Sequence, residues 1–234
     1  IYYMKIYCMS DIHGHRVEFE AALSLVIKHL NEPDAMLCLL GDYIHGGDDS
    51  YGVLDRIMEL QNEYGKDKVC ALMGNHEELV LFGECGINSG YNSSSDEIYN
   101  NKTDNDKYIR WMEKLPRWYK NGNTIFVHAG IDEDAGDWWQ WGTSDEIFVE
   151  KYPAETGRLE GLDMKVVAGH VGTGEISGNP NFHDIFYDGE SHYYIDGTVD
   201  VSSSIPVLMV DTSKDKYYKV TEHGCHEVLP YKEA

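Results

Sequence analysis

Residues 69–78 read VCALMGNHEE, an apolar run followed directly by Gly, Asn, His and two Glu. The apolar part is typical of a buried strand, and such strands rarely end in so many polar side chains. In α/β proteins, ligands bind beyond the carboxyl ends of the strands. We therefore expect GNHEE, residues 74–78, to form a loop that binds a charged group.

Four other apolar segments end in the same way, with a carboxylate, an imidazole or an amide just beyond the apolar run. The first three runs of the chain are separated by residues 17–30 and 51–65, whose apolar residues recur at helical spacing. Strands that alternate with helices predict βαβ units and a sheet covered on both faces. The polar strand ends should then converge on one edge. The four segments are MSDIHGH (9–15), LLGDYIHGG (39–47), FVHAG (126–130) and VVAGHVGTG (166–174).

The second half of the chain is less regular. Residues 83–107 are rich in Gly, Asn, Ser and Asp, and two interpretations are equally compatible with them: a long loop or small mobile cap, and a disordered insertion. Residues 106–121 predict an amphipathic helix followed by a turn that contains proline. Residues 184–197 and 207–220 predict two β-hairpins. We expect residues 1–234 to form one domain with a polar insertion or cap at about 83–107.

The charge of the chain limits its partners. The net charge of −22 results from 19 Lys and Arg against 41 Asp and Glu. Nucleic-acid polymers bind to basic surfaces, so this composition argues against such a partner. A small phosphate ligand remains compatible with an acidic chain, because bound metal ions invert the local field.

The N-terminal residues and the cysteines indicate where the protein works. No basic region followed by an apolar stretch begins the chain, and no apolar run approaches the about 20 residues of a membrane-spanning helix. Three of the five cysteines, Cys8, Cys38 and Cys70, lie in strand-like runs and are predicted to be buried thiols in a reducing compartment. We expect a cytoplasmic protein without a membrane partner.

Six residues at the strand ends form a candidate metal site. Taken singly, each has an ordinary explanation as a helix cap, a turn residue or a core histidine. Together they combine carboxylate oxygens with imidazole nitrogens, which suits Mn, Fe, Co, Zn or Mg. Six donors, including one carboxylate able to bridge, fit two divalent ions. The six are Asp11, His13, Asp42, Asn75, His128 and His170.

The order of these motifs resembles the calcineurin-like metallophosphoesterases. DIHGH, GDYIHGG, GNHE, HAG and GHVGT follow the motif order of that superfamily over roughly residues 5–210. The pattern is most similar to bacterial members of the serine/threonine phosphoprotein-phosphatase branch, whose relatives include diadenosine tetraphosphatases. The resemblance implies an α/β fold: a four-layer α/β/β/α sandwich of two mixed sheets flanked by helices, with a centre of two metal ions.

The resemblance also implies a role for each matching residue. Asp11, His13 and Asp42 would hold the first metal ion. Asp42 would bridge to a second ion, completed by Asn75, His128 and His170. A water that bridges the ions would attack phosphorus, His76 would donate a proton to the leaving group, and Glu77 would support the loop.

The sequence departs from the family pattern at three positions. His45 stands where an Asp normally pairs with the histidine of GNH, so His45 and His76 either act as a paired acid or repel protons from one another. Gly46 stands where an arginine normally grips phosphate. A second expected arginine is absent from residues 141–148, which offer Thr143 and Ser144. Other candidates for its role are Arg110, Arg117 and Arg158.

The expected function is hydrolysis of a phosphate ester by a metal-dependent, serine/threonine phosphatase-like enzyme. Its substrate would be a phosphorylated small molecule, a nucleotide or a phosphoprotein. Two alternatives remain open: a hydrolase of dinucleoside polyphosphates, and a metal-binding regulatory protein that has lost catalysis together with its arginines. The catalytic residues of the enzyme would be His76, Asp42 and His45.

Overall fold

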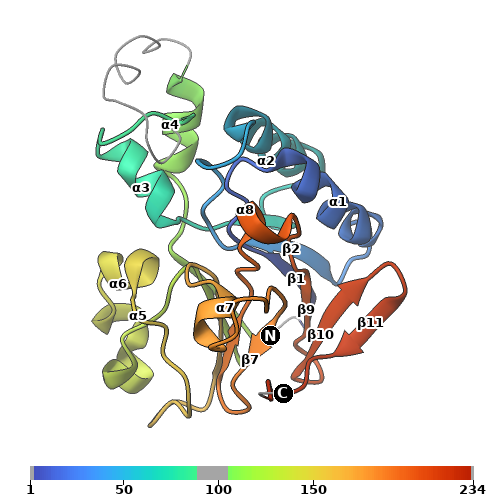
Figure 1. Ribbon diagram of the computed structural model, residues 1–234, viewed down its shortest axis with the longest axis vertical. Coiled ribbons are helices and arrows are strands. Elements are labelled where there is room, and N and C mark those ends of the chain that lie inside the picture. The colour runs from blue at the N-terminus through green and yellow to red at the C-terminus, as the bar shows by residue number, and fades with distance from the viewer. Residues whose placement is uncertain (1–2, 89–104, 233–234) are drawn as a thin grey trace.

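The computed structural model describes residues 3–88 and 105–232, which include two mixed β-sheets (Figure 1). In the first sheet, β1, β2 and β3 are parallel, and β9, β10 and β11 continue it in antiparallel fashion, in the order β11-β10-β9-β1-β2-β3. The strands are β1 Lys5–Met9, β2 Ala35–Leu39, β3 Val69–Ala71, β9 Leu208–Asp211, β10 Lys216–Thr221 and β11 Gly224–Glu227.

The second sheet has the order β4-β5-β6-β8-β7. Its central strands β5, β6 and β8 are parallel, and β4 and β7 pair with them in antiparallel fashion at the two edges. Both sheets therefore have a parallel part whose carboxyl ends share one edge. The strands are β4 Trp118–Asn121, β5 Thr124–Val127, β6 Lys165–Ala168, β7 Phe186–Tyr187 and β8 His192–Tyr194.

Helices cover the outer faces of the two sheets, which gives the predicted four-layer sandwich (Figure 1). Helices α1 and α2 pack on the first sheet, and α5 and α6 lie beside the second. The helices are α1 Arg16–Val26, η1 Ile27–His29, α2 Ser50–Tyr64, α3 Asn75–Leu81, α4 Asp106–Met112, η3 Glu133–Trp138, α5 Trp139–Gly142, α6 Asp145–Glu150, α7 Thr173–Ile176 and α8 Val199–Ser202.

The alternation of side chains along each strand divides the core into layers. In β1, Tyr7 points to the layer shared with the helices, whereas Ile6 and Cys8 point to the layer between the sheets. The opposite sheet fills that inner layer with Phe126 and Val167. Because both faces of the parallel strands are buried, their sequences read as continuous apolar runs.

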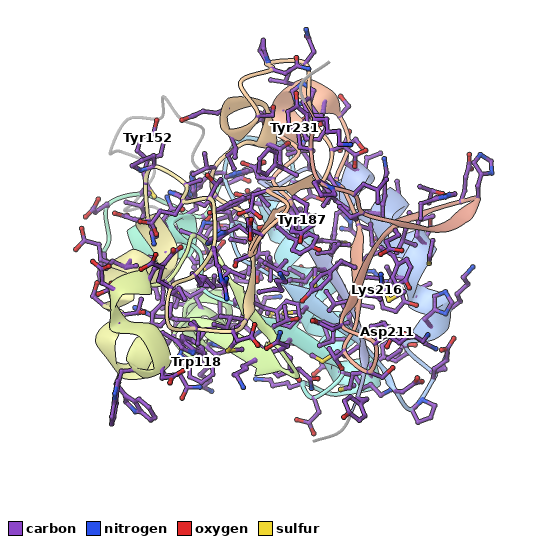
Figure 2. The ribbon with its side chains drawn as sticks, turned by 90° about the horizontal axis from the view of Figure 1, so that it is seen from below. Trp118, Tyr152, Tyr187, Asp211, Lys216 and Tyr231 are labelled. Atoms are coloured by element: carbon purple, nitrogen blue, oxygen red, sulfur yellow. The ribbon has the colours of Figure 1, made fainter. Side chains whose placement is uncertain are left out.

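Most of the expected elements are present. The periodic segment 17–30 forms α1 and η1, the segment 51–65 forms α2, and both predicted hairpins form as β7–β8 and β9–β10. Lys216 and Asp211 lie opposite each other across the second hairpin (Figure 2). The five cysteines are free; Cys8 and Cys38 are buried, as expected, whereas the prediction of a buried Cys70 was wrong, because Cys70 lies on the edge strand β3 and is partly exposed.

Two local predictions were wrong. Residues 75–78 are not a loop but the first turn of α3, because the Glu77 carboxylate accepts the N–H of Gly74 and so satisfies one of the unpaired groups at a helix start. Residues 118–121 are a strand, β4, rather than part of a turn. This strand is half-buried at the sheet edge and pairs with β5, a long-range interaction that local periodicity does not reveal.

The predicted insertion falls mainly on residues 89–104, which lie outside the described residues, so the single-domain arrangement with a cap stays a prediction. The described flanks are 83–88 after α3 and 105–107, where α4 begins. Within the described ranges, no helix combines the length and the apolar character needed to cross a bilayer.

A buried histidine on β8 should make stability depend on pH. His192 lies between Asp188 (3.0 Å) and Glu133 (2.8 Å). Burial lowers the pKa of His192, but the two carboxylates outweigh it and raise this pKa to about 9 from its usual 6.5. The protonated ring therefore stabilises the fold fully below about pH 6.5 and progressively less up to about pH 9, a contribution of up to roughly 3 kcal/mol.

We expect His192→Gln to remove most of this dependence, because glutamine carries no titratable proton. Urea unfolding at pH 6 and pH 9.5 measures the change for wild type and variant. The wild type should lose more free energy of unfolding between the two pH values than the variant loses. Equal losses would show that the raised pKa of His192 contributes nothing to stability.

Candidate metal centre

The six predicted ligands follow five parallel strands at one edge of the molecule. Asp11 and His13 come after β1, Asp42 after β2, and Asn75 after β3 in the first sheet, while His128 and His170 follow β5 and β6 in the second. Contacts to the backbone help to join the sheets at this edge. His128 Nδ1 lies 2.9 Å from the carbonyl of Leu40, and the backbone N–H of His170 donates to the Asp11 carboxylate at 3.0 Å.

The side chains converge in two groups that share Asp42. The first group contains His13, Asp42 and His76, and the second contains Asp42, His128 and His170; within each group the potential ligand atoms lie within 4.8 Å of one another. Asp42 Oδ2 lies 3.8 Å from His13 Nε2 and 3.4 Å from His128 Nε2. A carboxylate common to two donor groups is the arrangement that a bridging ligand requires.

Backbone carbonyls fix the orientation of two imidazoles. His128 Nδ1 bonds the carbonyl of Leu40 at 2.9 Å, and His13 Nδ1 lies 3.3 Å from the carbonyl of Ile44. Because a carbonyl only accepts, each Nδ1 carries a proton. Burial lowers the pKa of His128, but Asp42 outweighs it and raises this pKa to about 10, so in the absence of a cation Nε2 of His128 is protonated as well. Both Nε2 atoms face Asp42, so Nε2 is the atom that each ring would offer to a cation, as metal-ligating histidines do.

The backbone at this edge is strained at the predicted ligands. Four of the six predicted ligands have positive φ: Asp11 (53°), His13 (48°), Asp42 (55°) and His170 (65°). Residues other than glycine adopt this conformation at a cost, and such residues cluster at functional sites. The loops also pass very close together: a Cβ on Gly74 would lie 2.2 Å from Asp42 Oδ1.

Two buried carboxylates meet in this cluster. Burial alone would raise the pKa of Asp42, but His128, His76 and His13 bring it well below its usual range. Asp11 behaves differently: burial and the negative charge of Asp42 raise its pKa to about 6. Concentrated negative charge in a dry site is stabilised by a divalent cation, so the donor set fits one.

Asp11 and Asn75 complete the predicted set from the sides. Asp11 Oδ1 lies 3.8 Å from His13 Nε2. The Asn75 amide lies 3.0 Å from His128 Nε2, and with its nitrogen turned inward it reaches the Asp42 oxygens at 3.1 and 3.2 Å. The orientation of such an amide follows from its neighbours. A cation in the cluster would favour the oxygen-inward orientation.

Glu77 ties the loops together, as its predicted supporting role requires. It is fully buried, and its carboxylate accepts the backbone N–H groups of Asp42 (2.9 Å), Tyr43 (2.8 Å) and Gly74 (3.1 Å). Glu77 thereby joins the start of α3 to the loop after β2. It sets the distance between Asn75 on α3 and Asp42.

His45 and His76 are hydrogen-bonded to each other. Their Nδ1 atoms are 2.7 Å apart, so one ring donates and the other accepts, which two protonated rings could not do. His45 Nε2 lies 2.9 Å from the carbonyl of Gly86 and must be the donor there. Burial lowers the pKa of His45 and lowers that of His76 to about 4, so both rings are neutral. His45 Nδ1 therefore accepts from His76, whose Nε2 lies 3.8 Å from Asp42 Oδ2.

The positions of the missing arginines are filled by other contacts. Thr143 Oγ1 accepts the N–H of Asp132 at 2.9 Å, and Ser144 caps α6. A Cβ on Gly46 would lie 3.2 Å from the carboxylate of Asp200 on α8. That carboxylate bonds His15 Nε2 at 2.7 Å. Nothing in the spacing of residues 15 and 200 predicts this pair.

Only one of the three alternative arginines is tied to the metal-ligand helix. Arg117 pairs with Glu78 on α3, one helical turn from Asn75, and its Nε lies 2.9 Å from Asp145. Arg158 lines a cavity of about 580 Å³ that contains none of the predicted metal ligands, and Arg110 lies on the exposed side of α4.

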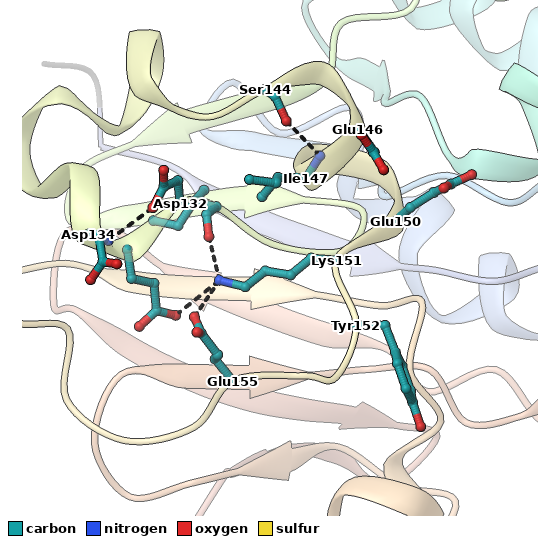
Figure 3. A pocket seen from close by; sticks show the side chains of 11 residues that line it. Asp132, Asp134, Ser144, Glu146, Ile147, Glu150, Lys151, Tyr152 and Glu155 are labelled. Carbon is teal, nitrogen blue, oxygen red and sulfur yellow. Dashed lines mark hydrogen bonds and ion pairs between the residues drawn. The ribbon is translucent and has the colours of Figure 1, made fainter.

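A second cavity, of about 470 Å³, adjoins the loop after β5 (Figure 3). Its walls carry six carboxylates, and its ammonium, Lys151, is held by Glu155, Glu133 and the carbonyl of Ile131. None of the six predicted metal ligands lines it. An acidic cavity of this kind repels phosphate, so it is not the phosphate site.

A sandwich of two mixed sheets with a His/Asp cluster at the strand ends defines the class of metal-dependent phosphoesterases. The chain belongs to the calcineurin-like phosphoesterase family, whose model matches residues 4–201. Divalent metal ions are implied by this family, and the cluster at Asp42 offers donors for them.

Curated relatives resemble part of the chain. A symmetrical bis(5'-nucleosyl)-tetraphosphatase of Nitrosospira multiformis is 32% identical over 131 residues, which are 55% of this chain and 44% of the relative. The corresponding protein of Pectobacterium carotovorum is 31% identical over 132 residues, again 55% and 44%. The matched stretch thus spans less than half the length of these relatives.

Solved structures share the fold at low identity. A cold-active protein-tyrosine phosphatase of a Shewanella species superposes with a TM-score of 0.68 at 17% identity, covering 97% of this chain and 80% of the other. A serine/threonine phosphatase of Saccharomyces cerevisiae gives 0.57 at 14% identity, covering 99% and 81%. At this identity the superpositions establish the fold alone.

Proposed function

We propose that the protein is a metal-dependent phosphoesterase that uses two divalent ions held by Asp11, His13, Asp42, Asn75, His128 and His170. The observation that supports this most is the pair of donor groups that share Asp42. When bound, two such ions activate water and neutralise charge on a phosphoryl group. The donor types suit Mn, Fe, Zn, Co or Mg.

The residues of the chain would orient and protonate the substrate around this centre. The carbonyl partners of His13 and His128 hold both Nε2 atoms toward Asp42. His76 would deliver a proton to the leaving oxygen from Nε2, the atom that faces the cluster, after its neutral ring takes up a second proton there. His45 would hold the His76 ring in place through the Nδ1 contact. Arg117 is our candidate for phosphate binding. Its guanidinium would leave Glu78 and pair with the phosphate of the substrate instead.

We propose a phosphorylated small molecule as substrate. A dinucleoside tetraphosphate is a second candidate, because the curated relatives are named for that substrate. The carboxylate of Asp200 lies beside Gly46, and its negative charge would repel a polyphosphate, which argues against tight binding of this substrate. A phosphoprotein is the third class. The five free thiols suit a reducing compartment, so we propose a cytoplasmic location.

A hydrolysis panel tests the proposal. Protein loaded with Mn would be offered a phosphomonoester, a phosphodiester, a phosphopeptide and diadenosine tetraphosphate, with Asp42→Asn as control. We expect turnover of the phosphomonoester or of the tetraphosphate, lost in the control. Protein that holds two ions but turns over nothing above the control would contradict the enzymatic proposal and favour a regulatory role.

The His45–His76 contact yields a second prediction. We expect His45→Asp to stabilise the doubly protonated His76 ring, because an aspartate at 45 accepts the Nδ1–H with a full negative charge. An acid with a higher pKa stays protonated to higher pH, so the basic limb of the pH–rate profile should move upward. Turnover of esters with poor leaving groups should rise about tenfold.

His45→Asn is the matched control, since it has the same shape as aspartate without the charge. Its basic limb should stay where the wild type has it. If both variants and the wild type share one profile, His45 is not coupled to proton transfer by His76.

A further inference from the structure

Three cysteines lie in one row across the parallel part of the first sheet. In the strand register, Cys8 of β1 is opposite Cys38 of β2, and Cys38 is opposite Cys70 of β3. Directly opposite residues of a sheet project to the same face. All three thiols therefore point into the layer between the sheets, where Cys8 and Cys38 belong to the apolar cluster and Cys70 packs against it.

The three thiols differ in exposure and in acidity. Cys8 and Cys38 are fully buried, and burial raises the pKa of both thiols well above the usual value. Cys70 lies on β3, the edge strand, and is partly exposed. A hydrogen bond from the Cys38 thiol lowers the pKa of Cys70. Cys70 is thus the accessible member and the better thiolate, with a second thiol directly beside it.

We propose that Cys70 and Cys38 form a reversible redox pair that a hydroperoxide oxidises to a disulfide. The Cys70 thiolate attacks the outer oxygen of the peroxide, which breaks the O–O bond, releases an alcohol or water and leaves a sulfenic acid on Cys70. The Cys38 thiol then attacks the Cys70 sulfur, expels water and closes the S–S bond. The two thiols lose two electrons and two protons, and the peroxide is reduced.

The strand geometry makes this bridge possible but strained. Neighbouring strands lie about 4.8 Å apart, within the Cα separations of roughly 4.4–6.8 Å that disulfides span. Parallel Cβ vectors keep the Cβ atoms near that spacing, whereas a disulfide draws them to about 3.8 Å. Bond formation must therefore pull β2 and β3 together. Strained bridges are also the ones most easily reduced, which makes the step reversible.

The bridge would act directly beneath the metal centre. Cys38 precedes Asp42 by four residues, and Cys70 precedes Asn75 by five. Glu77 couples the two loops through three backbone N–H groups, so a shift of β3 against β2 is passed to both ligands. On the proposed function, oxidation should lower turnover about tenfold or more, because small displacements at a reacting centre have large effects.

The test combines peptide mapping with activity. Full-length protein is treated with a small excess of hydrogen peroxide, the remaining thiols are alkylated, and the chain is cleaved after glutamate. Because the Glu32–Pro33 bond resists cleavage, Cys38 lies in peptide 21–59 and Cys70 in peptide 64–77. We expect these two peptides to be joined, with the loss of two hydrogen atoms, and to separate after dithiothreitol.

Two variants connect the bridge to activity. Cys70→Ser lies at the sheet edge and should resist peroxide, whereas Cys225→Ser removes an exposed thiol and should stay as sensitive as wild type. Unjoined peptides, or a bridge from Cys38 to Cys8, would overturn the proposal. Equal sensitivity of Cys70→Ser would overturn the link to turnover. If no state turns over substrate, the proposed function fails, and the peptide map still decides the redox pair.

Discussion

Replacing Asp42 with asparagine is expected to lower phosphoesterase turnover by more than about 100-fold, because even residues that only support metal ligands contribute 10- to 100-fold. Asp42 does more than that, since it belongs to both donor groups. Asparagine keeps an oxygen but loses the negative charge and presents an amide N–H₂ toward His13 or His128. Both ions should therefore bind more weakly.

The measurement is the number of metal ions retained after gel filtration, determined by elemental analysis, together with the rate on the best substrate of the panel. Asp48→Asn is the matched control: it makes the same chemical change in the same loop at an exposed position. Asp42→Asn should hold fewer than two ions, while Asp48→Asn should match the wild type. If Asp42→Asn retained two ions and full turnover, Asp42 could not be a bridging ligand.

The sequence predicts the fold and the candidate centre where strand ends carry the information. Apolar runs followed by Asp11, Asp42 or His128 need only the rule that parallel strands share a carboxyl edge, and the structure brings these side chains together. The apolar residues of α1 and α2 recur at helical spacing, a pattern that can likewise be read from nearby residues. These elements need no information from distant parts of the chain.

Other features depend on distant contacts and could not be read from the sequence. Strand β4 forms because β5 offers an unpaired edge, and the pair of His15 with Asp200 joins residues 185 positions apart. The helical start of α3 depends on Glu77, whose partners include residues 42 and 43 on another loop. The tautomers of His45 and His76 follow from the carbonyl of Gly86, which spacing alone does not place.

Replacing Glu77 with glutamine is expected to destabilise the protein strongly before any metal is considered. The two carboxylate oxygens accept three backbone N–H groups, at 2.8, 2.9 and 3.1 Å. Glutamine offers one oxygen, and its own N–H₂ would face one or two of these donors. Burial and the negative charge of Asp42 raise the pKa of Glu77 to about 8. Above that pH each hydrogen bond to the charged carboxylate contributes about 1.5–3 kcal/mol, so we expect a loss of roughly 3–5 kcal/mol in free energy of unfolding there.

The neighbouring Glu78→Gln makes the same chemical change on the same helix, where the carboxylate pairs with Arg117 and accepts no backbone N–H that binds a second loop. Urea unfolding of both variants in the presence of a chelator separates the fold from the metal centre. Glu77→Gln should lose several times more free energy than Glu78→Gln. Equal losses would mean that the loops after β2 and β3 hold their positions without Glu77. The metal ligands on them would then be positioned by the remaining contacts between the loops, such as the Asp42 carboxylate that accepts the N–H of His76 at 3.1 Å and the bond between His45 and His76.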